Sequence, residues 1–317
     1  MSVGFTEIPV RGKAITVPCA CIQGRTVIVT GKRIEVAALK DEDLVEGEPV
    51  STPESFVSDL RHSDLKADVF TFAQRVPEVT PRYKYHLEWD NRAVIPITTF
   101  GNWLEKRVEY DVRKAVKRAE RLGLVVKTAV FDDAFAEGIR GIYNESPVRQ
   151  NKAFWHYLKD IETVKQENGT YLDRSEFIGA YYEGELIGFI KLVYVGRIAC
   201  TLQVISQKKH SNKKPTNALL AKAVAICERR GVSHLVYGSY TYKGQKSPLT
   251  EFKRRNGFEQ ILLPRYYVPL TSVGRVALRL GLHRGLAEQV PEPVRALVRR
   301  ARSLWYDFKL NSPTPIS

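Results

Sequence analysis

A lysine-rich stretch, SQKKHSNKKPTNALL, directly precedes a predicted long helix. The residues that can contact an anion here are Lys208, Lys209, Lys213, Lys214, Thr216 and Asn217. Pro215 suits the first position of the helix, and no acidic residue lies between positions 207 and 214. The free N–H groups and positive dipole end of a helix N-terminus bind phosphate, and lysine ammonium groups add charge. We therefore predict a binding site for a phosphate-bearing donor, with a solvated loop as the alternative.

A second group of reactive side chains lies in the segment YNESPVRQNKAFWHY. Glu145 or His156 can act as the base that takes a proton from an acceptor amine. Arg149 can hold an acidic acceptor through two parallel hydrogen bonds. The alternative is structural, because a histidine beside Phe154 and Trp155 commonly packs in a core.

The elements that position these side chains follow a specific order. From residue 124 to 270 the sequence predicts a strand, two helices, three strands joined by tight turns, a long helix, a strand, a short helix and two last strands. The expected helices are 132–146, 151–166, 216–230 and 247–257, and the strands of the central run are 176–183, 185–195 and 197–206. Glu183-Gly184 and Gly196 suit hairpin turns. This is an α/β order with an antiparallel run, unlike a doubly wound Rossmann pattern.

That order resembles the GNAT superfamily of acyltransferases and, within it, the FemAB-like branch, whose members carry amino acids or other acyl groups onto cell-envelope precursors. The resemblance rests on RKAVKRAERLGLVV, on IGAYYEGELIGFIKLVYV in the hairpin, on PTNALLAKAVAICERRGV in the central helix and on FKRRNGF near its end. It implies the fold class, a mixed α+β sheet of the GNAT acyltransferase fold. Since FemAB-like proteins carry two copies of this fold, residues 1–100 are expected to form a reduced, β-rich GNAT-like half.

The resemblance also implies where the acyl group binds. In GNAT enzymes the fourth and fifth strands separate, and the acyl group lies between them. On the fifth strand Tyr237 would protonate the leaving group, while Ser239, Tyr240 and Tyr242 would contact the acceptor. Gln203 on the fourth strand would orient the donor. The alternative for each tyrosine is packing in the core.

Lys253 matches the lysine of the FemAB-like Phe-Lys-x-x-x-Gly-Phe motif. The resemblance places its ammonium group near the acyl carbonyl, where it would stabilise developing negative charge. An exposed helix lysine beside Arg254 and Arg255 is the alternative.

One departure from the GNAT pattern concerns the donor. GNAT enzymes usually bind the pyrophosphate of coenzyme A with an (Arg/Gln)-x-x-Gly-x-(Gly/Ala) loop, and the lysine-rich stretch of this chain contains no glycine. FemAB-like enzymes that take an aminoacyl-tRNA share this loss. Acyl-CoA, such as acetyl-CoA, is expected to be the donor, with aminoacyl-tRNA as the alternative, and no metal is expected.

Two further segments are strongly basic. Residues 101–123 are predicted to form one amphipathic helix whose polar face carries Lys106, Arg107, Arg113, Lys114, Lys117, Arg118 and Arg121. Residues 271–317 are predicted to form a basic helical extension that packs on the main domain with its basic faces in water. The alternatives are contact of residues 271–310 with an anionic membrane and binding to an RNA backbone. Between the N-terminal half and this extension lie residues 101–123 and the GNAT-like domain, residues 124–270.

The whole chain of 317 residues has a formal charge of +14, which favours a polyanionic partner such as a nucleic acid, a phosphate-rich cofactor or an anionic membrane. Four cysteines without zinc-ligand spacing, no signal-peptide pattern and no long apolar run indicate a cytoplasmic location. The sequence predicts an N-acyltransferase that acts on an amine, such as a cell-envelope or polysaccharide precursor. The rival hypothesis is a non-catalytic nucleic-acid-binding or scaffold protein with a degenerate GNAT fold.

Overall fold

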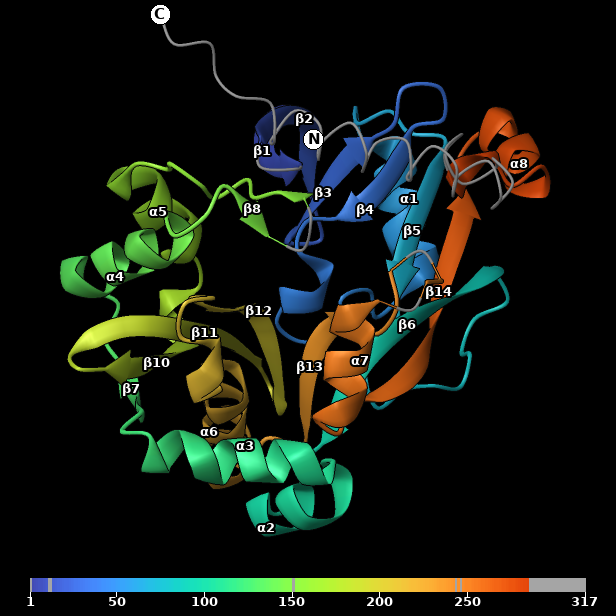
Figure 1. Ribbon diagram of the computed structural model, residues 1–317. Coiled ribbons are helices and arrows are strands. Elements are labelled where there is room, and N and C mark those ends of the chain that lie inside the picture. The colour runs from blue at the N-terminus through green and yellow to red at the C-terminus, as the bar shows by residue number, and fades with distance from the viewer. Residues whose placement is uncertain (1, 11–12, 150–151, 243, 246, 285–317) are drawn as a thin grey trace, which may run out of the picture.

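One mixed sheet runs through the described part of the chain, which comprises residues 2–10, 13–149, 152–242, 244–245 and 247–284 of a computed structural model. Its twelve strands lie in the order β1-β2-β3-β4-β5-β14-β6-β13-β12-β11-β10-β7 (Figure 1). A separate two-stranded ribbon is formed by β8 (Val148–Arg149) and β9 (Lys152–Ala153). This mixed α/β arrangement agrees with the predicted fold class.

The N-terminal region supplies one side of the sheet. Its elements are β1 (Gly4–Val10), β2 (Lys13–Ile22), β3 (Arg25–Thr30), β4 (Val36–Leu39), the 3-10 helix η1 (Glu42–Leu44), α1 (Pro53–His62), β5 (Val69–Ala73) and β6 (His86–Pro96). Helix α1 begins with a proline at its first turn and buries Phe56 and Leu60 against Phe70 and Phe72 of β5. Apolar residues on one face of the helix and of the strand therefore form the core of this region.

The C-terminal region supplies the other side. Its elements are β7 (Val125–Ala129), α4 (Asp133–Tyr143), α5 (Ile161–Asn168), η3 (Leu172–Arg174), β10 (Ser175–Tyr182), β11 (Glu185–Val195), β12 (Ile198–Ser206), η4 (Ser211–Lys213), α6 (Pro215–Arg229), β13 (His234–Ser239), α7 (Pro248–Arg255) and β14 (Glu259–Pro269). Glu183 and Gly184 both have positive φ, 51° and 83°, as a two-residue hairpin turn requires. The predicted hairpins at this turn and at Gly196 are confirmed.

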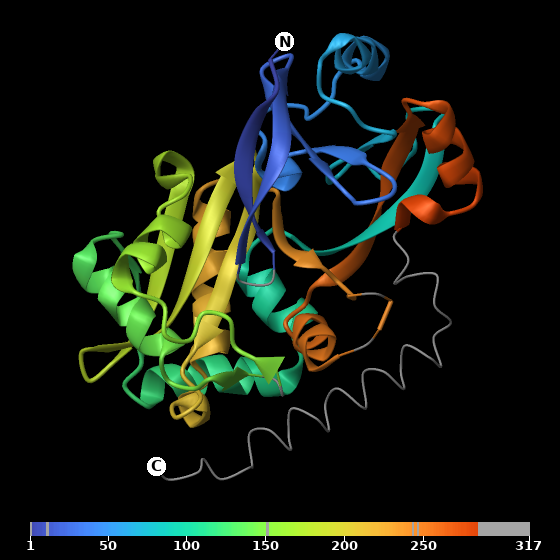
Figure 2. The same cartoon turned by 90° about the horizontal axis from the view of Figure 1, so that it is seen from above.

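The two sides of the sheet interleave. Strand β14, late in the sequence, pairs with both β5 and β6, and β6 pairs in turn with β13. Because β14 lies between β5 and β6, and β6 pairs with β13, strands of the two regions lie side by side in one sheet (Figures 1 and 2). Residues from both regions can therefore contribute to a site at β13.

Helices cover both faces of the C-terminal side. Neighbouring residues of β11 point to opposite faces, as in any strand. Phe189 packs with Ile139 of α4, whereas Ile190 packs with Leu219 of α6. Helix α3 (Tyr110–Arg121) packs on α6 on the second face (Figure 1). The buried core thus lies in two layers, one on each side of β11.

The prediction of one continuous helix over 101–123 is wrong. The chain forms α2 (Phe100–Asn102) and a π-helical turn, η2 (Trp103–Arg107), and then breaks before α3. Val108 and Glu109 have extended backbones, with ψ of 147° and 155°. The carboxylate of Glu109 bonds to Arg254 and Arg255 of α7, so contacts between distant segments override the apolar periodicity.

The prediction of a helix over 151–166 is also wrong for its first part. The ribbon β8–β9 and a turn come first, and α5 begins after Asp160, whose side chain accepts a hydrogen bond from the backbone N–H of Thr163. Leu158 has a φ of 60°, which no right-handed helix contains. Phe154 and His156 are not helical, because their side chains pack around Tyr143.

The predicted basic extension is described only in part. Helix α8 (Ser272–Arg279) and η5 (Leu282–Arg284) pack beside β14, while residues 285–317 lie outside the described residues. Among the described helices none is long and apolar enough to cross a membrane.

Candidate active site

The site is built where β12 and β13 separate. The two strands pair in parallel only over Ile198–Cys200 and His234–Val236. Beyond these pairs β12 continues to Ser206 and β13 to Ser239 with no register between them. The two strands therefore diverge beyond Cys200 and Val236, as the resemblance implied.

A β-bulge lies on β12 at this point. Leu192 of β11 pairs with Thr201 and its neighbour Lys191 pairs with Gln203, so Leu202 has no partner in β11. Its side chain is also among the exposed large apolar residues, with 43% of its surface accessible. A bulge bends the strand and interrupts its ladder of hydrogen bonds to the neighbouring strand. Sequence analysis missed Leu202, because nothing in an alternating apolar strand marks the extra residue.

The ammonium group of Lys253 is buried in the same region. Lys253 lies on α7 and is 0% exposed. Its Nζ donates a hydrogen bond to the carbonyl oxygen of Ser239 at 2.6 Å, and lies 4.5 Å from the ring centre of Tyr237 and 5.1 Å from that of Tyr242. Burial lowers the pKa of Lys253 to about 8. The alternative of an exposed helix lysine does not fit this position.

Lys191 provides a useful comparison, since it is a second buried lysine with a pKa lowered by burial to about 8. Its Nζ bonds to the carbonyl oxygen of Asn168 at 2.7 Å, to the hydroxyl of Thr170 at 3.0 Å and to the carbonyl oxygen of Thr170. An ammonium group has three N–H donors, so Lys191 is saturated. Lys253 has one hydrogen-bond acceptor among the described residues, and its ammonium group otherwise lies over the rings of Tyr237 and Tyr242.

The predicted tyrosines surround this lysine at different depths. Tyr237 packs against Phe258, and burial raises its pKa well above 10. Tyr240 packs at the edge of the core, and Tyr242 is 52% exposed. The Tyr237 phenol therefore stays neutral and holds the ammonium by its ring face.

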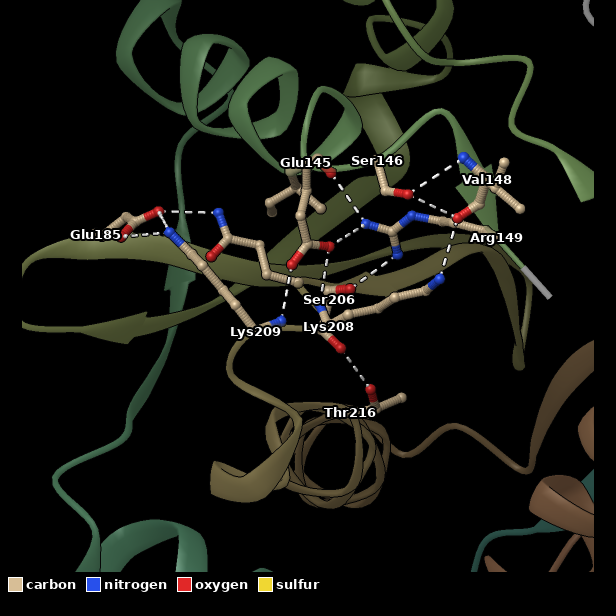
Figure 3. Close-up of polar contacts among 11 residues, drawn as sticks. Glu145, Ser146, Val148, Arg149, Glu185, Ser206, Lys208, Lys209 and Thr216 are labelled. Atoms are coloured by element: carbon tan, nitrogen blue, oxygen red, sulfur yellow. Dashed lines mark hydrogen bonds and ion pairs between the residues drawn. The ribbon is translucent and has the colours of Figure 1, made fainter. Parts of the chain in front are cut away.

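Glu145 and Arg149 form a half-buried clamp at the end of β12 (Figure 3). The Glu145 carboxylate accepts hydrogen bonds from the backbone N–H groups of Lys208 and Lys209, both at 2.8 Å. Arg149 bonds to this carboxylate at 3.1 Å and to the carbonyl oxygens of Ser206 and Ile142 at 2.8 and 3.0 Å. Burial lowers the pKa of Arg149, opposed by the charge of Glu145. The clamp fixes the lysine-rich loop to α4 with internal contacts.

The lysine side chains of this loop also have protein partners. Lys208 Nζ bonds to the carbonyl oxygen of Val148 at 3.0 Å, and Lys209 Nζ pairs with Glu185 at 3.0 Å (Figure 3). Lys213 Nζ lies 3.5 Å from the ring centre of Tyr182.

The first turn of α6 is held in place on both sides. Lys214 has a φ of 59° at the start of α6. The Thr216 hydroxyl lies 2.8 Å from the hydroxyl of Ser206, and Asn217 donates to Asn256 at 3.1 Å. The loop is therefore an ordered part of the fold rather than a free solvated segment.

Two predicted residues belong to the packing between α4, α5 and the sheet. The His156 ring lies 4.5 Å from the ring of Tyr143, and its Nδ1 lies 3.4 Å from Glu167. Gln203 accepts a hydrogen bond from the Tyr143 hydroxyl at 2.8 Å, and burial raises the pKa of Tyr143 to about 12. These contacts occupy both side chains within the protein.

Comparison with solved structures shows the same fold. FemX covers 82% of this chain and 88% of its own, with a TM-score of 0.56 and 12% identity. The L-PGS structure from Bacillus licheniformis covers 83% and 88%, with a TM-score of 0.54 and 16% identity. The C-terminal domain of a putative lysylphosphatidylglycerol synthetase from Agrobacterium fabrum gives 83% and 86%, a TM-score of 0.51 and 13% identity. No family model matches the sequence, and no curated protein is significantly similar to it.

The chain therefore shares the fold of FemX and of the two lysylphosphatidylglycerol synthetase structures. The similarity extends over four fifths of the chain and so includes the N-terminal region as well as residues 124–270. At these identities the likeness concerns the fold, and the chemistry of the site has to be argued from its own residues.

Proposed function

We propose that this protein transfers an aminoacyl group from aminoacyl-tRNA to an acceptor amine, at the separation of β12 and β13. The observation that carries the proposal is the buried ammonium of Lys253, which keeps hydrogen-bonding capacity beyond its bond to Ser239, its one acceptor in the part of the chain that the structure describes. A buried cation without a carboxylate partner is costly to the fold, which favours a functional role for it.

The reaction would use this ammonium as an electrostatic catalyst. The acceptor nitrogen attacks the ester carbonyl carbon, and the negative charge that develops on the carbonyl oxygen is stabilised by the ammonium group of Lys253. The C–O ester bond then breaks, the amine loses a proton, and the ribose hydroxyl leaves with one. Tyr237 positions the ammonium through its ring. The Glu145 carboxylate is bound by backbone N–H groups and Arg149, and the His156 ring packs on Tyr143. We therefore assign the role of base to neither.

The lysine-rich loop is already engaged in contacts within the protein, which is the reason to prefer tRNA over coenzyme A as the donor. The N–H groups of Lys208 and Lys209 bond to Glu145 instead of being free for a pyrophosphate. Pro215 at the first position of α6 has no N–H to offer. A carboxylate at this position also repels a phosphate. These contacts favour aminoacyl-tRNA over acyl-CoA as the donor, whereas the sequence favoured acyl-CoA.

A basic surface beside the site supports the same choice. The exposed residues Lys114, Lys117, Arg118 and Arg121 lie on α3, and α3 contacts η4 of the lysine-rich loop. The basic side chains of the helix therefore lie near the lysine-rich loop, and their charges suit the phosphate backbone of an RNA. The names of the similar structures, FemX and lysylphosphatidylglycerol synthetase, agree with aminoacyl transfer.

The donor is tested by following a label. The full chain is incubated with tRNA charged with a mixture of ¹⁴C-labelled amino acids, or with ¹⁴C-acetyl-CoA, and with a cell extract as the source of acceptors. We expect transfer of alkali-stable label from the charged tRNA only. Transfer from acetyl-CoA alone would reject the tRNA proposal and restore acyl-CoA as the donor, and binding of tRNA without any transfer would favour the non-catalytic alternative.

The basic surface is tested by the salt dependence of tRNA binding. We expect the double variant Lys117→Gln and Arg118→Gln to lower the slope of log K against log salt by about two, since each lost phosphate contact removes about one. The matched control replaces Lys32 and Lys66, which are exposed in the N-terminal region, with glutamine. Equal slopes for the two double variants would show that α3 does not contact the RNA.

A further inference from the structure

Two histidines and a glutamate converge at the far end of the sheet. His86 and Glu88 are two residues apart on β6 and so point to the same face. His283 reaches them from η5, at the C-terminal end of the described chain. Glu88 Oε1 lies 2.6 Å from Nε2 of His283 and 3.5 Å from Nε2 of His86. The three candidate ligand atoms all lie within 4.8 Å of one another.

We infer that His86, Glu88 and His283 bind a zinc ion that fixes η5 to β6. Two imidazole nitrogens and one carboxylate oxygen are a common zinc ligand set. Zinc–ligand distances of about 2.1 Å in a tetrahedron place the ligand atoms about 3.4 Å apart. The distance from His86 to Glu88 already matches this value. Rotation of the side chains would bring His283 to the same separation.

The surroundings suit a bound ion with one open side. The His283 side chain is 1% exposed, that of Glu88 20% and that of His86 40%. The Tyr267 ring covers His283, with 4.7 Å between the ring centres. An ion can therefore enter from the side of His86, and water can complete its coordination there.

The Glu88 carboxylate also binds Arg284. The Arg284 guanidinium bonds to the same oxygen of Glu88 at 2.9 Å. Its side chain is 53% exposed, so it can turn toward solvent or move to the second carboxylate oxygen when an ion binds. The carboxylate then keeps a partner in both states.

The zinc site is separate from the proposed transfer site. His86 pairs with Tyr267 at the outer end of β6, whereas the contact of β6 with β13 involves residues 92–96. The ion would serve the structure by joining segments almost 200 positions apart in the chain, and it takes no part in the reaction. This site departs from the expectation that no metal is bound.

Metal binding is tested on the chelator-treated full chain by titration calorimetry with zinc chloride. We expect one saturable site per chain and a zinc-dependent rise in the melting temperature. His86→Ala and Glu88→Gln should each weaken the affinity at least tenfold. His62→Ala is the matched control, since His62 lies on α1, bonded to the carbonyl oxygen of Ser58, and it should change neither quantity.

Cobalt distinguishes this site from binding to the free cysteines. Cobalt bound to nitrogen and oxygen ligands gives visible absorption without the near-ultraviolet band of a cobalt–thiolate bond, which the exposed Cys21 would produce. Absence of zinc binding, a thiolate band, or equal affinities of the His86→Ala and His62→Ala variants would each overturn the inference. These measurements do not use transfer activity, so they stand or fall independently of the proposed function.

Discussion

Replacement of Lys253 by methionine should alter the pH dependence of stability in a calculable way. Methionine is unbranched like lysine and one heavy atom shorter, and it removes the charge. In the folded protein burial lowers the pKa of Lys253 from 10.5 to about 8. Between these two pH values the unfolded chain binds a proton at this lysine and the folded chain does not. Stability of the wild type therefore rises with pH across this window, relative to the variant.

The size of the effect follows from the gap between the two pKa values. About 2.5 pH units, at about 1.4 kcal/mol each, give about 3 kcal/mol. Below pH 8 the wild type bears the full cost of its buried charge, and above about 10.5 it bears none. Lys191 and the buried tyrosines are the same in both proteins, so their titration cancels in the difference.

Urea unfolding at several values between about pH 7 and 11 measures this difference. We expect the free energy of unfolding of the wild type, minus that of Lys253→Met, to increase by about 3 kcal/mol over the range. Lys66→Met, which removes an exposed lysine, should show no such trend. A difference that stays constant with pH would mean that Lys253 titrates as an ordinary solvated lysine, and would refute its burial.

Two further substitutions test the frame of the site by urea unfolding. Gly188→Ala should destabilise the protein by about 2 kcal/mol, because the new Cβ would lie 2.8 Å from a β12 side chain. The control is Gly141→Ala in α4. Its new Cβ meets no atom within 4 Å, so this variant should be neutral or stabilising by up to about 1 kcal/mol. Equal effects would contradict the close approach of β11 to β12. Glu145→Ala should cost about 2 kcal/mol, since the half-buried Arg149 loses its carboxylate and two backbone N–H groups lose their acceptor. Loss of the exposed Glu137 should cost under about 1 kcal/mol. A cost for Glu145 no larger than that for Glu137 would argue against the clamp.

Much of the fold was predictable, because the informative features are local. The hairpin turns follow from glycines that tolerate positive φ, and the central helix α6 from a long apolar pattern that ends at Gly231. The order of these elements was enough to predict the GNAT-type sheet.

The predictions that were wrong depend on distant contacts. The break at Val108 reflects ion pairs between Glu109 and α7, about 145 positions away in the chain, and an apolar period carries no information about them. The turn at Leu158 reflects packing of His156 on Tyr143. Periodicity alone predicted a helix in both places.

The candidate site, too, was predictable only where its features are local. Lys253 could be selected from a short motif, although its burial and its contact with Ser239 required the structure. The bulge at Leu202 depends on the register of two strands and leaves no mark in the sequence. Glu145 was expected to be a base, and the contact of its carboxylate with the backbone of Lys208 involves residues 63 positions apart.

The most direct test of the proposed chemistry is label transfer from charged tRNA by the wild type and by two lysine variants. The proposal predicts that Lys253→Met binds charged tRNA with unchanged affinity but transfers label at least 100-fold more slowly, as expected when a group that stabilises the oxyanion is removed. Lys66→Met should transfer label at the wild-type rate. Full activity of Lys253→Met would contradict the central claim, because the site would then have lost the group that defines it.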